Sequence, residues 1–294
     1  MLKGYIFLAF ALAGGLFKGI CGKLISNGAE TFKQVLSVNI VRMFFCAFIG
    51  FCVVAISGIS SLSVDGPTVA ICLFSAVCMT TFCVCWMFAY RFEAYMYLNI
   101  FTMLGAVATC FFGLAVFKEP ISAGQWFGMV ILLVAVYIMT IYNKNLKGKM
   151  SFFEIVLLTV GALGSSLADF SQKIYTKTIG TNASVFNFYT YLFSLVILLI
   201  VTLFVKSPEK EKKEADKKYL ILCFVMSVCL YINSLFKTFA ASCLTTAQMY
   251  PVLQGANLIF SALTAHIFFK EKVTPRCIVG MTCAFAGLII MNVL

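Results

Sequence analysis

Ten apolar runs of about twenty residues fill almost the whole chain. As a helix, each run is long enough to cross a hydrocarbon layer about 30 Å thick. Their approximate limits are 4–25, 35–57, 68–90, 95–117, 123–142, 152–174, 184–205, 219–241, 245–269 and 275–293. Because 62% of the 294 residues are hydrophobic and only 11% are charged, polar side chains could not cover a soluble globule of this length. The sequence predicts an all-α integral membrane protein with ten transmembrane helices.

The charged and metal-ligating residues exclude several classes of protein. The formal net charge is +11, but the lysines stand in short segments between apolar runs and do not interleave with aromatic residues, so no nucleic-acid partner is expected. Thirteen cysteines are scattered without a CxxC spacing, and His266 is the single histidine, which argues against a disulfide framework, a metal site or a cofactor. No catalytic constellation or nucleotide-binding loop is present, so the chain is not expected to be an enzyme.

A short motif occurs twice, as AVFKEPIS at 115–122 and as IFFKEKVT at 267–274. The two Lys-Glu pairs lie 152 positions apart (270 − 118), and the same offset aligns further residues of the two halves, such as Gly128 with Gly280. We infer a duplication of five helices, with one repeat at 1–147 and the other at 148–294. An odd number of spans in each half makes the second repeat inverted relative to the first, which is the plan of many secondary transporters.

The repeated motif also has a local role. Ser122 and Gln125 have the spacing of a helix-capping box. Glu119 and Glu271 are therefore interpreted as capping or turn-fixing groups, with a role in gating as the alternative.

Two long stretches, one from each half of the chain, resemble a known family of proteins. The stretches FAYRFEAYMYLNIFTMLGAVATCFFGLAVFKEPISAGQWFGMVILLVAVYIM and FKTFAASCLTTAQMYPVLQGANLIFSALTAHIFFKEKVTPRCIVGMTCAFAGLIIM resemble the halves of an EamA-type member of the drug/metabolite transporter superfamily. The resemblance implies a central cavity lined by helices one to four and six to nine, with helices five and ten at the periphery. Asn99 stands where such proteins usually carry a proline in the fourth helix.

Ionisable and polar residues inside the spans are the candidate site residues, because a charge at the bilayer centre needs a cavity or a partner. Lys18 and Arg42 lie at about the same depth and form a candidate basic pair, the alternative being that both snorkel to the interface. Asp169 is expected to pair with Lys173 or Lys237 in a gating, ion-coupling or purely structural role, and Asn233 belongs to the same set. The other candidates for solute binding are Trp86, Tyr90, Asn99, Asn187, Tyr189, Tyr250, Gln254 and Asn257. A helix break at Pro251 is expected beside the last three.

These features predict a secondary transporter that moves a small polar metabolite, such as an amino acid or another solute with an anionic group, by alternating access. A flippase for lipids or polyprenyl carriers and a drug exporter of the same architecture are the alternatives. The expected location is the cell membrane, as a multi-pass protein, with a monomer favoured over a homodimer. Lysines and arginines concentrate in the loops away from the termini, so the positive-inside rule places both termini outside, whereas the family resemblance implies cytoplasmic termini.

Overall fold

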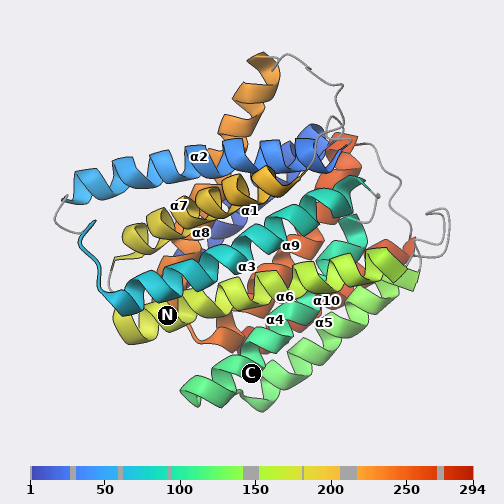
Figure 1. Ribbon diagram of the computed structural model, residues 1–294. Coiled ribbons are helices and arrows are strands. Elements are labelled where there is room, and N and C mark those ends of the chain that lie inside the picture. The colour runs from blue at the N-terminus through green and yellow to red at the C-terminus, as the bar shows by residue number, and fades with distance from the viewer. Residues whose placement is uncertain are drawn as a thin grey trace.

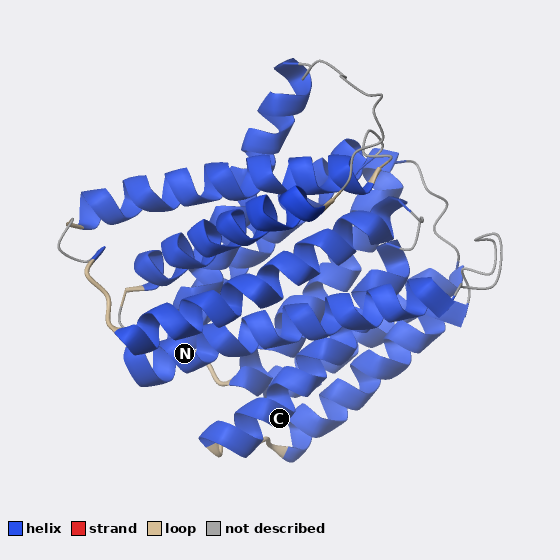
Figure 2. Ribbon diagram, viewed as in Figure 1, coloured by secondary structure: helices blue, strands red, loops and turns tan. Residues whose placement is uncertain are grey.

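The computed structural model describes residues 2–26, 31–58, 62–91, 95–141, 152–180, 182–205, 217–269 and 275–293. Helices account for nearly all of this part of the chain, and no strand occurs in it (Figure 2). In chain order the helices are α1 (Leu2–Ser26), α2 (Phe32–Ser57), α3 (Gly66–Arg91), α4 (Tyr95–Phe117), α5 (Ala123–Ile141), α6 (Phe152–Ile174), the π-helical turn η2 (Tyr175–Ile179), α7 (Ala183–Phe204), α8 (Lys217–Cys243), α9 (Thr246–Phe269) and α10 (Pro275–Val293).

The ten predicted helices are confirmed, and their ends differ from the predicted limits by three residues or fewer. The capping box before α5 is also confirmed, since the Ser122 N–H donates to Gln125 Oε1 at 3.0 Å and the Gln125 N–H donates to Ser122 Oγ at 3.2 Å. Six helices of the described part (α1, α2, α3, α6, α7 and α8) are long and apolar enough to span a membrane. The predicted break at Pro251 is wrong, because α9 continues through it. Pro251 lies in the second turn, where its missing N–H costs only one helical hydrogen bond.

The two halves of the chain interlock. Five pairs of helices from opposite halves make extensive contacts: α1 with α8, α3 with α6, α2 with α7, α4 with α9 and α5 with α10 (Figure 1). Exchanging the first five helices for the last five converts α1–α8 into α6–α3, and it maps each of the other three pairs onto itself. Such a pattern is what a two-fold relation between repeats produces. α5 and α10 pack mainly on each other, at the edge of the bundle, as the resemblance implied.

Two glycines make the long crossings possible. A Cβ on Gly14 of α1 would lie 2.8 Å from the Cys229 carbonyl oxygen of α8, and a Cβ on Gly164 of α6 would lie 2.9 Å from the Cys78 carbonyl oxygen of α3. Only glycine allows two backbones to approach this closely. A glycine therefore allows close backbone contact at both of the equivalent crossings, α1 with α8 and α6 with α3.

The proposed division between residues 147 and 148 falls within 142–151, outside the described residues. The division into repeats and the inversion of the second repeat stay predictions. The interlocked contacts mean that neither half is a separate compact unit.

Candidate functional site

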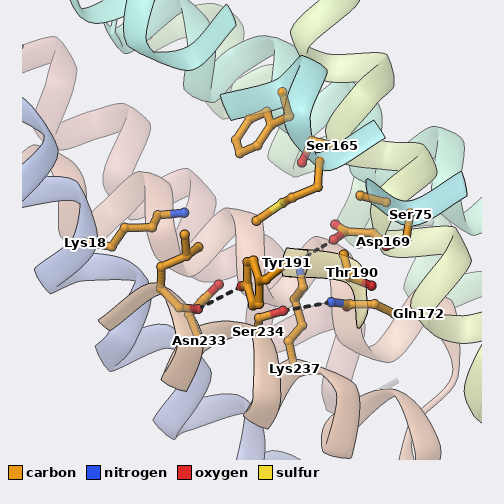
Figure 3. A pocket seen from close by; sticks show the side chains of 14 residues that line it. Lys18, Ser75, Ser165, Asp169, Gln172, Thr190, Tyr191, Asn233, Ser234 and Lys237 are labelled. Carbon is orange, nitrogen blue, oxygen red and sulfur yellow. Dashed lines mark hydrogen bonds and ion pairs between the residues drawn. The ribbon is translucent and has the colours of Figure 1, made fainter. Parts of the chain in front are cut away.

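A polar cavity lies inside the bundle, between α1, α3, α6, α7 and α8 (Figure 3). The volume open to the centres of water-sized molecules is about 40 Å³, which gives room for roughly three waters. Its lining includes Lys18, Ser75, Ser165, Asp169, Gln172, Thr190, Tyr191, Asn233, Ser234 and Lys237. A metabolite could enter only if these helices moved apart, so the structure has a contracted cavity.

Lys18 reaches the cavity from α1, across from Asp169 and Gln172 (Figure 3). Its Nζ lies 5.9 Å from the ring centroid of Phe82 and 5.5 Å from that of Trp86, both on α3. No carboxylate oxygen of the described residues lies within 4.0 Å of this ammonium group. Lys18 thus points inward and does not snorkel to an interface.

Arg42 of α2 lies one layer behind the cavity lining and is 1% exposed. Its guanidinium carbon is 5.5 Å from the Trp86 ring centroid, and its Nη1 donates to Asn39 Oδ1 at 2.8 Å. Its Nε has no hydrogen-bond partner among the described residues. The structure therefore brings Lys18, Arg42 and Trp86 together, as a basic pair that shares one aromatic ring.

Asp169 forms its ion pair with Lys237, so the structure selects one of the two predicted partners. The carboxylate is buried, whereas the Lys237 side chain is 15% exposed and lines the cavity. The hydroxyl of Tyr250, itself fully buried on α9, donates to the main-chain oxygen of Asp169 at 2.6 Å. This pair joins α6, α8 and α9 on one side of the cavity.

Lys173 faces away from the cavity and pairs with Glu119, at 3.1 Å between Nζ and Oε1. It also donates to the carbonyls of Ala241, at 3.1 Å, and of Leu244, beyond the end of α8. Ser165 and Asp169 line the cavity and Lys173 does not, because a spacing of eight residues from Ser165 turns the Lys173 side chain about 80° around the helix.

Glu119, in the connection after α4, caps α9. Its Oε2 accepts hydrogen bonds from the N–H of Thr246 at 2.7 Å and from the Thr246 hydroxyl at 3.0 Å. Burial raises the pKa of this carboxyl, but the Thr246 N–H and the Lys173 ammonium outweigh burial, so its pKa lies below the usual value. We call Glu119, Lys173 and Thr246 the clasp. The capping interpretation is confirmed for Glu119, whereas Glu271 lies outside the described residues.

The other polar candidates lie beside the cavity or away from it. Asn187 donates to Ala183 O at 2.7 Å and to Thr238 Oγ1 at 3.0 Å, and it accepts from the Ser234 hydroxyl, so it braces the cavity wall. Asn233 lines the cavity and donates to Ala11 O. Tyr189 instead donates to Leu62 O at 2.6 Å, near the loop before α3, and does not line the cavity.

Three further candidates complete the comparison. Asn257 lies next to Gly15 of α1, and Gln254 is half-buried on α9, but neither lines the cavity. The side chains of Tyr90 and Asn99 lie outside what the structure describes. No group of three metal-ligating side chains occurs in the described ranges.

Residues 152–293, which include α6 to α10, match the model of the EamA-like transporter family. This second half of the chain is similar to EamA-like transporters. The apolar helices and this family match agree, and both indicate a multi-pass protein in a lipid bilayer. A sequence search of curated proteins finds no match.

Solved structures share the fold of this chain. A total of 28 chains match, among them one whose title reads "Crystal structure of protein". That structure aligns over 100% of this chain and 97% of its own, with a TM-score of 0.76 and 8% sequence identity. At this identity the likeness concerns the fold alone.

Several residues that line the cavity were not predicted from the sequence. Gln172, Ser234 and Tyr191 line the cavity, and Gln172 Oε1 is buried without a hydrogen-bond partner in the described part of the chain. Helical phase contained the signal, because Gln172 follows Asp169 by three residues and Ser234 precedes Lys237 by three. Tyr191, four residues after Asn187, shares a face with it, whereas Tyr189 does not.

Proposed function

We propose that this EamA-type transporter carries a small polar solute with an anionic group, such as an amino acid or an organic acid. The observation that carries the proposal is the charge around the cavity. Lys18, Arg42 and Lys237 supply three cations, and Asp169 supplies one carboxylate. Buried cations without a counter-ion are costly, so a carboxylate or phosphate group of the solute stabilises the site by completing it.

Polar groups around the charges support a hydrophilic solute. Gln172 Oε1 has no hydrogen-bond partner among the described residues, and Ser75 and Ser165 also line the cavity. The lining also has apolar side chains, such as Met79 and Leu230, but a long lipid chain would leave the charged groups of the lining without partners. We therefore favour a soluble metabolite over a lipid, a polyprenyl carrier or a lipophilic drug.

Transport by alternating access requires the contracted cavity to open toward each side in turn. We assign the gating or ion-coupling role to Asp169 and Lys237 and to the neighbouring Asn233, with Lys173 acting through the clasp. The transporter is expected in the cell membrane, as a monomer.

The test is transport by the purified full chain in lipid vesicles, with amino acids, dicarboxylates, sugar phosphates, nucleobases and organic cations as the panel. Arg42→Gln and Lys18→Gln should each weaken the apparent affinity for the transported anion roughly ten- to hundredfold, since a charged hydrogen bond contributes about 1.5–3 kcal/mol. Lys33→Gln, at an exposed position of α2, is the matched control and should leave affinity unchanged.

Wild-type affinity in both cavity variants, or a native solute that is a quaternary cation, would contradict the proposal. A flippase would move no soluble compound and would instead change the protection of lipid head groups.

A further inference from the structure

Trp86 is the shared neighbour of two interior cations, Lys18 and Arg42. The Lys18 ammonium and the Arg42 guanidinium carbon each lie 5.5 Å from its ring centroid. The ring is 6% exposed and rests on Gly22 of α1, where a Cβ would come within 2.2 Å of the ring carbon Cη2. Gly22 therefore leaves the space on α1 that the indole occupies in this structure.

The Trp86 ring has an electrostatic role because Lys18 and Arg42 have no nearby carboxylate among the described residues. Neither has a carboxylate within 4.0 Å among the described residues, and Arg42 Nε has no hydrogen-bond partner there. The face of an indole carries a partial negative potential that attracts cations, and the attraction is strongest where water is excluded. In this structure the ring occupies the place that a counter-ion would have.

We propose that Trp86 is a positioning residue that stands in for the anionic group of the solute in the empty transporter. A carboxylate or phosphate group then enters by displacing the indole from Lys18 and Arg42, and the ring returns when the group leaves. This inference rests on the proposed function, because it requires that the anionic group binds at the basic pair.

The inference predicts that replacing Trp86 strengthens anion binding, whereas a direct contact between Trp86 and the solute predicts that the replacement weakens it. If the ring competes with the anion, Trp86→Leu removes the competitor and should tighten anion binding about two- to thirtyfold, the range given by the strength of a cation–π contact. Trp86→Phe keeps a weaker π face and should tighten it less. If the ring binds the solute, both variants bind more weakly.

The chain itself supplies a spectroscopic probe. It contains two tryptophans, and Trp126 lies on α5, where it is 37% exposed and contacts the ring of Phe111. Trp126→Phe leaves Trp86 as the only indole. Titration of this full-length variant in lipid vesicles with inorganic phosphate, succinate or alanine, and with choline as a cation control at matched ionic strength, should shift the Trp86 emission saturably for the anion that binds. Adding Lys18→Gln or Arg42→Gln should abolish the shift.

The possible results separate the two proposals. A saturable shift with tighter binding in Trp86→Leu supports the inference, and Trp86→Phe decides the matter if the leucine variant does not fold. Weaker binding in the Trp86 variants, or no emission change while Lys18→Gln still weakens binding, overturns the inference and leaves the proposed function standing. Unchanged affinity in Lys18→Gln and Arg42→Gln overturns both.

Discussion

The repeated Lys-Glu pair divides two tasks between neighbouring residues. Lys118 adopts the left-handed backbone conformation, with φ of 53°, directly after α4. The turn leaves Lys118 exposed and directs Glu119 inward, where it caps α9 and pairs with Lys173. In this charged motif Lys118 thus forms an exposed turn, and Glu119 forms a buried helix cap.

Glu119→Gln should destabilise the folded chain by about 3 kcal/mol, because it leaves the buried Lys173 ammonium without its counter-charge. Thermal unfolding in detergent measures the change, and Lys118→Gly is the control, since glycine favours positive φ and should not lower stability. Adding Lys173→Met to Glu119→Gln should restore part of the loss, as expected for coupled neighbours. Equal stability of wild type and Glu119→Gln would show that the clasp contributes nothing.

The lowered pKa of Glu119 gives the same contact a pH dependence. The pKa of Glu119 is lower in the folded chain than in the unfolded one, where an ordinary glutamate has a pKa of about 4.3. The clasp therefore contributes its full stabilisation at pH values above that ordinary pKa. Its contribution fades as the pH falls through the folded pKa.

Asp169→Asn should slow turnover roughly tenfold while tightening anion binding, because Lys237 then loses its carboxylate and holds the solute instead. Flux and binding in vesicles measure the two effects. The double change Asp169→Asn with Lys237→Gln removes both charges and should return binding toward the wild-type value. An unchanged flux and pH profile in Asp169→Asn would remove Asp169 from the gate.

Site residues were predictable from the sequence where a charged side chain lies inside a membrane-spanning run. Lys18, Arg42 and Asp169 were found because a charge inside an apolar run needs a partner. Their partners depended on helix phase and on the third dimension, so Lys237 remained one of two choices. The clasp was missed because Glu119 meets Thr246, which lies 127 positions away along the chain.

At the scale of elements, the long helix crossings depend on small residues. Gly14→Val should cost about 3 kcal/mol or more, because the new side chain meets the Cys229 carbonyl and the Asn233 N–H, which are backbone groups that cannot rotate away. The midpoint of thermal unfolding measures it. Gly66→Ala is the control, since nothing lies within 4 Å of its Cβ position. Equal midpoints would refute the close approach of α1 and α8.

Helix limits were predictable because an apolar run of fixed length has one way to satisfy its backbone in a bilayer. The pairing of helices was not predictable, because the most extensive contacts join helices from opposite halves of the chain. The predicted break at Pro251 was wrong because a proline in the second turn of α9 removes only one helical hydrogen bond.

At the scale of the molecule, charge asymmetry predicts topology. The loops away from the termini carry most of the lysines and arginines, so both termini should lie outside the cell. A green fluorescent protein fused after Leu294 should therefore stay dark in a bacterial host, whereas alkaline phosphatase fused there should be active. Fusions after Asn145 should give the reverse result. Bright fluorescence after Leu294 would place the termini in the cytoplasm.

The interlocking of the halves bears on how the chain is made. Asn233 of α8 donates to Ala11 of α1, 222 positions earlier. At about 5–20 residues per second, a ribosome needs roughly 10–45 seconds to supply the second partner after the first has emerged. During that interval α1 lies in the bilayer with its glycine face against lipid or a chaperone. We therefore expect newly made first halves to be the species on which membrane quality control acts.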